Sequence, residues 1–298
     1  MYKKIGLLII LTHSLISVAA PVEKAPKHNH KVIHKSIKRI SKISDSPKLR
    51  SSIALIYDEL DHRQIYAKKA DAVSPIASIS KLMTAMVVLD AKLPMDEEIT
   101  ISPEDEDTLK GTHSRMCPGM TLTRRELIKL ALMSSENRAA AALARTYPGG
   151  TQVAVEKMNE KALELDMNET HFMDPTGLNS GNVSTATDLV KMVLAAQSYE
   201  PIHEATTSTS HLAKPEGYRP LLYKNTNPLV MNPSWAIGIS KTGYINEAGR
   251  CLVMQTNFKR RPVVIVLLHS QGKSTRIGDA KRIKKWMEAS SKRSIRHG

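Results

Sequence analysis

Several common features are scarce or absent in this chain. Aromatic residues make up only 4% of its 298 residues, so a packed core has to come from aliphatic side chains, Met and Ala. Its two cysteines, Cys117 and Cys251, allow one disulfide at most, and their spacing does not decide whether they pair. No internal repeat is found, and no apolar run beyond the first twenty residues is long enough to span a membrane. The expected organisation is one large domain or two small ones.

Net positive charge is also missing from the central part of the chain. The formal net charge is +14, yet residues 51–271 contain 23 basic and 25 acidic side chains. Residues 21–50 and 272–298 each carry nine Lys or Arg against two acidic residues. A nucleic-acid-binding protein would interleave basic and aromatic residues on a folded face, and that pattern is absent. We expect the basic ends to be solvated tails or to contact an anionic cell wall or membrane surface.

The first twenty residues have the pattern of a secretory signal peptide. Lys3 and Lys4 form its positively charged start, an apolar stretch follows at 5–18, and small residues end at Ala19 and Ala20, where we expect cleavage. The pattern predicts an exported protein, with an uncleaved membrane anchor as the alternative.

Residues 21–50 are rich in Lys, His, Ser and Pro and contain few core-forming residues, which predicts a flexible linker. Three of its histidines, His28, His30 and His34, are metal-ligand types, but no carboxylate or Cys cluster supports them. We therefore assign no metal site.

Apolar periodicity predicts strands at both ends of the folded part and helices between them. The expected strands lie at 53–57, 64–67, 235–241, 251–258 and 263–269. The expected helices lie at 78–89, 137–147, 153–165, 185–197 and 275–289, and a further helix follows capping-box spacing at 123–126. The short connections between strands favour an antiparallel sheet. The fold class is therefore α+β, with an antiparallel five-stranded sheet flanked by terminal helices and an inserted all-helical lobe at about 90–200. We expect this domain to span 51–290, before a basic tail at 291–298.

Three short motifs carry the chemistry. They are Ser78-Ile79-Ser80-Lys81, Ser135-Glu136-Asn137 and Lys241-Thr242-Gly243, and they follow one another 57 and then 106 residues apart. Each alone has an ordinary structural explanation, as a helix start, a helix cap or the end of a strand. Together they supply a nucleophile, two amines, a relay hydroxyl and an amide, a set suited to acyl transfer through a serine ester.

The spacing within the motifs suits these roles. Ser78 and Lys81 are three residues apart at an expected helix start, so they share a face. A serine hydroxyl needs an adjacent base, and Lys81 can serve if burial and nearby positive charge keep its amine neutral. The backbone N–H of Ser78 is a candidate oxyanion donor. Lys241 and Thr242 suit a substrate carboxylate, and Gly243 permits close approach of a backbone.

With these motifs and four longer strings, about residues 50–290 resemble the penicillin-binding protein and serine β-lactamase superfamily. The strings lie at 132–140, 172–178, 223–227 and 239–255. Within it, the chain is most similar to low-molecular-mass D-alanyl-D-alanine peptidases of the penicillin-binding protein 7 type, which are soluble periplasmic endopeptidases. The resemblance implies a β-lactamase-type α/β sandwich, no metal or cofactor, β-lactams as covalent inhibitors, and peptidoglycan cross-bridges as the substrate.

The resemblance also assigns the catalytic residues. It implies that Ser78 is the acylated nucleophile and Lys81 its base. Ser135 would relay the proton toward the leaving amine, and the backbone N–H groups of Ser78 and Tyr244 would form the oxyanion hole.

The remaining residues are implied to bind substrate. Asn137 would hold the substrate amide and Lys81, while Lys241 and Thr242 would bind the substrate carboxylate or support the Ser135 proton. Gly243 completes this strand motif.

Two departures narrow the expected function. The stretch 172–178 lacks the Glu-x-x-Leu-Asn pattern with which a class A β-lactamase activates its deacylating water. Only 55 residues follow Gly243, too few for the extra β-domain and amphipathic anchor of the anchored carboxypeptidases. We therefore expect a periplasmic serine D,D-endopeptidase that cuts D-alanyl-meso-diaminopimelyl cross-links. A D,D-carboxypeptidase and a penicillin-acylated, non-catalytic cell-wall sensor or scaffold are the alternatives.

Overall fold

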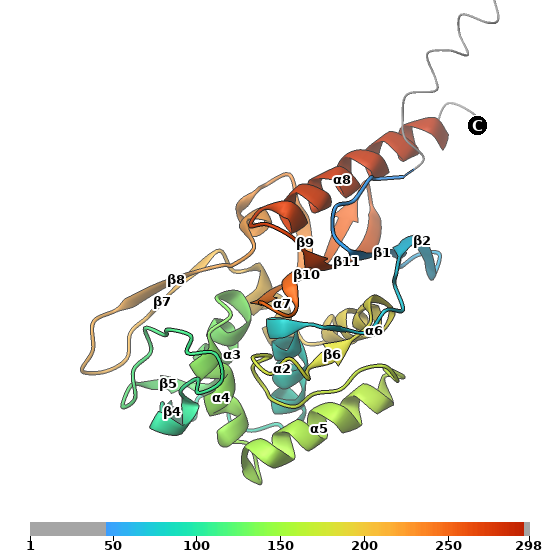
Figure 1. Cartoon of the computed structure of the whole chain (residues 1–298). Helices are drawn as coiled ribbons and strands as arrows, with labels where there is room; N and C mark the ends of the chain where they lie inside the picture. The colour runs from blue at the N-terminus through green and yellow to red at the C-terminus, as the bar shows by residue number, and fades with distance from the viewer. Residues whose placement is uncertain (1–45, 295–298) are drawn as a thin grey trace, which may run out of the picture. The chain divides into compact units, whose positions relative to one another are not determined.

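The structure, a computed structural model, describes residues 46–294 (Figure 1). The expected signal peptide at 1–20, the three linker histidines and residues 295–298 lie outside the described residues. Of the expected linker, only 46–50 is described, and this piece packs on the folded part. Leu49 is buried, and the backbone N–H of Arg50 donates to the Asp279 carboxylate. The folded part therefore begins before residue 51.

A five-stranded antiparallel sheet organises the described part, with strand order β2-β1-β11-β10-β9. Its strands are β1 (Ile53–Asp58), β2 (Arg63–Lys68), β9 (Ala236–Ile245), β10 (Gly249–Phe258) and β11 (Arg261–Ser270). Short turns join β9, β10 and β11, whereas β1 pairs with β11 from the opposite end of the chain. The expected fold class and the antiparallel five-stranded sheet are confirmed, and β9 lies at an edge of the sheet.

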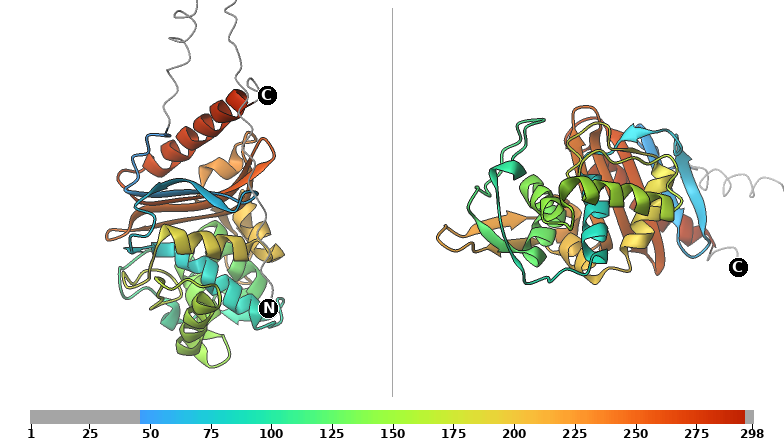
Figure 2. Two further views of the ribbon diagram at one scale, coloured as in Figure 1. Left: turned by 90° about the vertical axis from the view of Figure 1, so that its right-hand side faces the viewer. Right: turned by 90° about the horizontal axis from the view of Figure 1, so that it is seen from below.

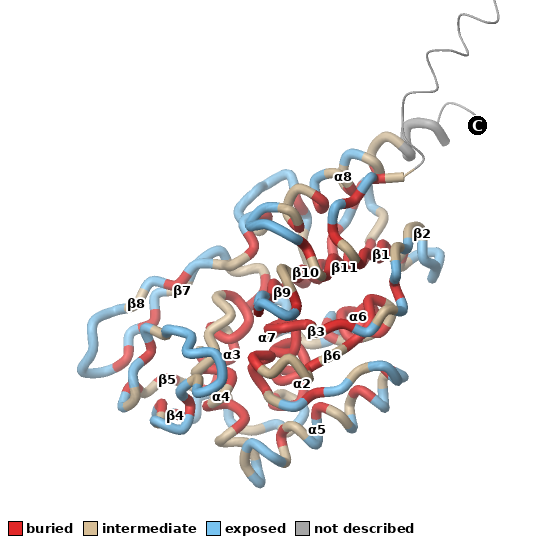
Figure 3. Tube along the Cα trace, viewed as in Figure 1, coloured by how far each residue is buried: buried red, intermediate tan, exposed pale blue. Residues whose placement is uncertain are grey.

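Apolar side chains bury both faces of the sheet, so it lies between two layers of helices (Figures 2 and 3). One face packs against α8 (Thr275–Ser294), which contributes Ala280, Ile283 and Met287 to that layer. The other face belongs to a continuous apolar core that includes α2 (Lys81–Asp90) and α6 (Ala186–Ala196). Alternate residues of each strand point to the two layers, which explains the nearly unbroken apolar runs of β10 and β11.

The remaining helices form the lobe beside α2. They are α3 (Arg124–Met133), α4 (Asn137–Arg145), α5 (Gly150–Glu164) and α7 (Glu200–Thr207). Short strands also pair here: β3 (Ser74–Pro75) with β6 (Val183–Ser184), β4 (Glu98–Thr100) with β5 (Thr121–Thr123), and β7 (Ser210–Ala213) with β8 (Leu221–Lys224). Three 3₁₀ turns complete the elements: η1 (Ala77–Ser80), η2 (Pro103–Asp105) and η3 (Pro228–Met231). The expected insert therefore contains strands and is not all-helical. The sequence did not predict these strands because two to four residues are too few to show a period.

Local capping explains where two of these helices begin. Thr123 and Glu126 form the expected capping box at the start of α3, each side chain accepting the other residue's backbone N–H. Thr185 likewise accepts the N–H of Asp188 at the start of α6. The helix expected from Ser78 onward is instead divided into η1 and α2.

The two cysteines are both free thiols. Cys117 is exposed, whereas Cys251 is buried in β10, and burial raises the pKa of the Cys251 thiol to about 11. Cys117 and Cys251 therefore do not form the disulfide that the sequence left open. Within 46–294, none of the helices combines the length and the apolar character needed to cross a membrane.

Candidate active site

Ser78 and Lys81 meet at the junction of η1 and α2. A 3₁₀ turn has three residues per turn, so positions 78 and 81 lie one above the other. The Nζ atom of Lys81 lies 2.8 Å from the Ser78 Oγ atom, and both residues are buried. Ala77, just before Ser78, has φ = +49°, an unfavourable backbone angle for a residue with a Cβ atom. The chain therefore holds the hydroxyl against the amine at some conformational cost.

Two further acceptors surround the Lys81 amine. Its Nζ lies 2.7 Å from Asn137 Oδ1 and 2.6 Å from the carbonyl oxygen of Thr176. Burial lowers the pKa of Lys81 to about 7, although the carboxylates of Asp174, Glu136 and Asp107 oppose this shift. A neutral amine has two N–H donors and one lone pair. If the donors go to Asn137 and Thr176, the lone pair is left for the proton of Ser78.

The loop before β6 delivers the Thr176 carbonyl. The Asp174 carboxylate accepts the backbone N–H groups of Thr176, Gly177 and Asn179, which closes the loop upon itself. Asn182 ties this loop to η1 by donating to Ser80 Oγ at 2.9 Å. Gly177 has φ = +79°, and a Cβ atom there would collide with the backbone of Ala77. Only glycine lets the loop lie this close to the Ser78 peptide.

Ser135 and Lys241 form the second amine–hydroxyl pair. Ser135 follows α3 with φ = +61°, and its Oγ accepts a hydrogen bond of 2.8 Å from Lys241 Nζ. Lys241 also donates to the Thr242 carbonyl at 2.8 Å. Burial, together with the nearby cations of Lys81 and Arg276, holds the pKa of Lys241 well below its ordinary value. The neutral form of this amine is therefore more accessible than that of an ordinary lysine.

The strand motif on β9 borders the same space. Thr242 Oγ1 donates to Thr226 Oγ1 at 2.7 Å. A Cβ atom at Gly243 would lie 3.1 Å from the backbone nitrogen of Ser78, so β9 packs directly on η1. The Tyr244 side chain is half exposed, stacks against Arg250 and donates to Asn246. Only the backbone of Tyr244 was predicted to take part, and the contacts of its side chain are with Arg250 and Asn246, outside the three motifs.

The structure thus brings together the predicted residues from η1, α2, the α3–α4 break and β9. It also reveals groups that the motifs did not indicate. The Thr176 carbonyl and Thr226 lie in strings that carried the resemblance without an assigned role. Arg276 is 9% exposed, and its Nε and Nη1 atoms have no hydrogen-bond partner. In the sequence it looks like one more basic residue of the C-terminal segment, so no signal could have singled it out.

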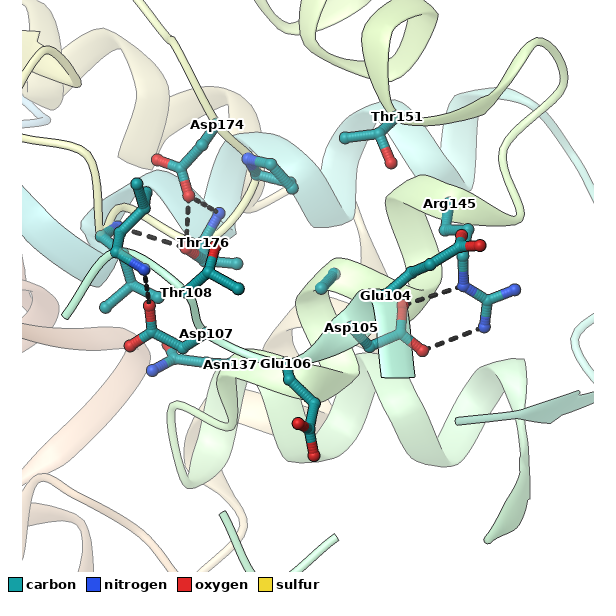
Figure 4. Close-up of a pocket in the computed structure, with 14 residues that line it drawn as sticks. Glu104, Asp105, Glu106, Asp107, Thr108, Asn137, Arg145, Thr151, Asp174 and Thr176 are labelled. Carbon is teal, nitrogen blue, oxygen red and sulfur yellow. Dashed lines mark hydrogen bonds and ion pairs between the residues drawn. The ribbon is translucent and has the colours of Figure 1, made fainter. Parts of the chain in front are cut away.

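A cleft of about 170 Å³ opens beside Asn137 and Thr176 (Figure 4). Its lining is rich in carboxylates: Glu104, Asp105, Glu106, Asp107 and Asp174. Four of them already have partners: Asp105 pairs with Arg145 and Glu106 with Arg138, while Asp107 and Asp174 accept backbone N–H groups. In the part of the chain that the structure describes, no group of His, Cys, Asp and Glu is arranged to hold a metal ion.

Comparison with known proteins gives a consistent result. Residues 40–272 match the peptidase S11 family, described as D-alanyl-D-alanine carboxypeptidase. The chain is 46% identical over 241 residues to a D-alanyl-D-alanine endopeptidase of Pseudomonas aeruginosa, covering 80% of this chain and 78% of that protein. It is 44% identical over 246 residues to a D-alanyl-D-alanine endopeptidase of Escherichia coli, covering 82% and 79% of the two chains.

Solved structures agree with the sequence relatives. The Streptomyces K15 DD-transpeptidase superposes with a TM-score of 0.77 at 28% identity, covering 83% of this chain and all of that one. Penicillin-binding protein D2 of Listeria monocytogenes in its cefotaxime-bound form superposes with a TM-score of 0.71 at 26% identity, covering 80% and 97% of the two chains.

Proposed function

The chain belongs to the D-alanyl-D-alanine carboxypeptidase family of serine peptidases, S11, and on this basis we propose that it is a serine D,D-endopeptidase of peptidoglycan. Its reaction is hydrolysis of D-alanyl-meso-diaminopimelyl cross-links through an ester on Ser78. The observation that carries this proposal is the 2.8 Å contact between Ser78 Oγ and the buried amine of Lys81, whose pKa is lowered to about 7. The two endopeptidase relatives support the choice of cross-link cleavage.

Acylation begins with proton transfer from the Ser78 hydroxyl to the Lys81 lone pair. The Ser78 Oγ atom attacks the carbonyl carbon of D-alanine, and the backbone N–H groups of Ser78 and Tyr244 stabilise the negative charge on the carbonyl oxygen. The bond from that carbon to the leaving nitrogen then breaks. Ser135, held by Lys241, passes its proton to the leaving amine and takes the proton that Lys81 gained, so that the amine departs neutral and Lys81 recovers its lone pair.

Deacylation uses the same groups in the reverse sense. A water molecule takes the place of the leaving amine and gives a proton to Lys81 as it attacks the ester carbonyl. The Ser78 oxygen leaves with that proton, which regenerates the free hydroxyl and releases a peptide ending in D-alanine. The enzyme needs no group beyond these side chains for the proton balance.

The substrate also carries a carboxylate next to the scissile bond, on the D-centre of diaminopimelate. Lys241 and Arg276 are buried and close enough for their charges to interact, and two Arg276 nitrogens lack partners. An incoming carboxylate would favour the protonated form of Lys241 and pair with both groups, with Thr242 as an additional donor. Asn137 would use its second N–H to hold the substrate amide.

A D,D-carboxypeptidase is the second candidate, because the matched family carries that description and the catalytic groups would be the same. The third candidate, a penicillin-acylated sensor without catalysis, is disfavoured by the placement of Lys81 on Ser78. The similarity to a cefotaxime-bound penicillin-binding protein supports β-lactams as covalent inhibitors of this chain.

We place the enzyme in the periplasm on the signal-peptide pattern at 1–20, and we assign wall or membrane-surface contact to the basic segments at 21–50 and 272–298. Sedimentation with isolated wall sacculi across a salt series tests this contact. At low salt, the chain lacking 21–45 should pellet less than the full mature chain, because the deletion removes positive charges that attract the wall. Pelleting of the full mature chain should fall as salt rises, because salt screens the same attraction. The deletion stops at 45 because residues 46–50 pack on the folded part.

The decisive experiment is incubation with purified muropeptides followed by mass analysis. Cross-linked dimers should be converted to monomers, and the Ser78→Ala variant should leave them intact. Loss of an activated nucleophile typically costs on the order of 10⁶ in turnover. Release of terminal D-alanine from pentapeptides with dimers untouched would establish the carboxypeptidase instead. If the wild-type chain forms neither product, the result would support the sensor.

A further inference from the structure

A chain of hydrogen bonds links Lys81 to a surface segment that the catalytic motifs do not include. We call residues 107–112 the strap. The Asn137 Nδ2 atom donates to Thr112 Oγ1 at 2.9 Å, while Asn137 Oδ1 accepts from Lys81. The Thr112 hydroxyl in turn donates to Asp107 Oδ2 at 2.7 Å, and the Thr112 backbone N–H donates to the same oxygen at 2.8 Å.

This chain has a fixed direction. Because the Asp107 carboxylate can only accept, the Thr112 hydroxyl must donate its proton to Asp107 and accept the hydrogen bond from Asn137 with a lone pair. The amide of Asn137 then points its NH₂ group to the strap and its oxygen to Lys81. In the flipped orientation, the NH₂ group would face Lys81 and compete with Ser78 for the amine lone pair.

We propose that Thr112 and Asp107 are positioning residues that hold the Asn137 amide in the orientation which leaves the Lys81 lone pair free for Ser78. The inference rests on the proposed function, since it concerns the same acylation step. Neither strap residue touches Ser78 or Lys81 through a hydrogen bond, so both act through Asn137.

The strap is itself well held. Asp107 accepts the backbone N–H groups of Leu109 and Lys110 as well as that of Thr112. The Lys110 ammonium forms an ion pair with Glu247, in the turn between β9 and β10, so the strap is tied to the sheet as well as to the lobe. This ion pair is partly exposed and distant in the hydrogen-bond chain from Asn137, which makes it a useful control.

Asp107 also acts by its charge. The carboxylates of Asp174, Glu136 and Asp107 raise the pKa of Lys81 against the effect of burial, and on the β9 side the amines of Lys81 and Lys241 interact through their charges. Removing the Asp107 charge should therefore lower the pKa of Lys81. A flip of Asn137 should also lower the pKa of Lys81, because it removes an acceptor that stabilises the ammonium form.

The test measures the second-order rate constant for acylation by a fluorescent penicillin as a function of pH, using the mature full chain. Thr112→Val should slow acylation by about 3- to 10-fold on the high-pH plateau of the profile, which corresponds to the loss of one ordinary hydrogen bond. It should also move the acid limb of the pH profile to lower pH. Thr112→Ser keeps the hydroxyl and should stay within about twofold of the wild type. Asp107→Asn should slow acylation and also move the acid limb to lower pH.

Three comparisons make the result decisive. Intact mass at long times should show complete acylation of every variant, since the strap changes a rate and not the fold. Lys110→Ala should stay within about twofold, because an exposed ion pair contributes little. The proposal is overturned if Thr112→Val acylates like the wild type, or if Lys110→Ala is slowed as much. No acylation of the wild-type chain at Ser78 would instead contradict the proposed function.

Discussion

The Lys241 Nζ atom donates to Ser135 Oγ at 2.8 Å across the boundary between the sheet and the helical lobe. Lys241 belongs to the edge strand β9, whereas Ser135 lies in the break between α3 and α4. The two halves of the fold therefore each supply one member of this amine–hydroxyl pair. A shift of the lobe against the sheet would separate the relay hydroxyl from its amine.

Acylation by penicillin should depend on pH with an acid limb near pH 7. Burial lowers the pKa of Lys81 from 10.5 to about 7, so its amine is protonated and has no lone pair below that pH. Well below the midpoint, the rate constant should fall about tenfold per pH unit. Stopped-flow acylation between about pH 5 and pH 9 measures this. A rate that is constant down to about pH 5 would show that Lys81 is not the base.

The penicilloyl enzyme should hydrolyse slowly. The loop at 172–178 brings no free carboxylate to the site, because Asp174 already accepts three backbone N–H groups. No other side chain of the loop can activate water on the far side of the ester. Intact-mass time courses after removal of excess penicillin should show the adduct persisting. Rapid return to the free mass would indicate a β-lactamase.

Arg276→Gln should impair activity without loss of stability. A charge-assisted hydrogen bond to the substrate carboxylate is worth about 1.5–3 kcal/mol, so kcat/KM for muropeptides should fall by about 10- to 100-fold. The Tm should stay the same or rise, because the wild-type guanidinium is buried beside Arg250 with two unpaired nitrogens.

Arg282→Gln is the matched control for this change. Arg282 lies on the same helix and pairs with Asp279, away from the cleft contacts. Its activity should match the wild type. Equal loss of activity in both variants would mean that the basic face of α8, and not the Arg276 guanidinium, matters for substrate.

Gly177→Ala should cost both stability and acylation rate. Its φ of +79° disfavours a Cβ atom by about 1–2 kcal/mol, and the atom would also displace the backbone at Ala77 and Ser78. Gly217→Ala is the control, since φ is +73° there but nothing lies within 4 Å of the added atom. Urea unfolding should show the larger loss for Gly177→Ala, and only this variant should acylate slowly. Equal losses would mean that the contact with η1 is unimportant.

Much of the fold follows from local signals in the sequence. The apolar runs at 251–258 and 263–269 predicted the central strands, and the capping box at 123–126 marked the start of α3, because both depend on neighbouring residues. The start of α2 was misplaced by one turn, since a 3₁₀ turn and an α-helix carry the same apolar pattern over four residues.

The site was predictable only in part, for a similar reason. The three motifs name side chains, and the structure brings these side chains together. The Thr176 carbonyl is a backbone group, so no residue type announces it. Thr112 and Arg276 reach the site through tertiary packing, and neither has a sequence neighbour in the motifs.

The positive φ angles of Ala77 and Ser135 have a consequence for how this sequence can change. Each puts a side chain where glycine would be more stable, and each flanks or carries a catalytic group. Stabilising substitutions are usually easy to find, and glycine at 77 or 135 or an apolar residue at 81 would be among them. Selection for thermal stability alone would therefore replace these residues of the site before others. Consensus or directed-evolution libraries of this chain should keep positions 77, 81 and 135 fixed.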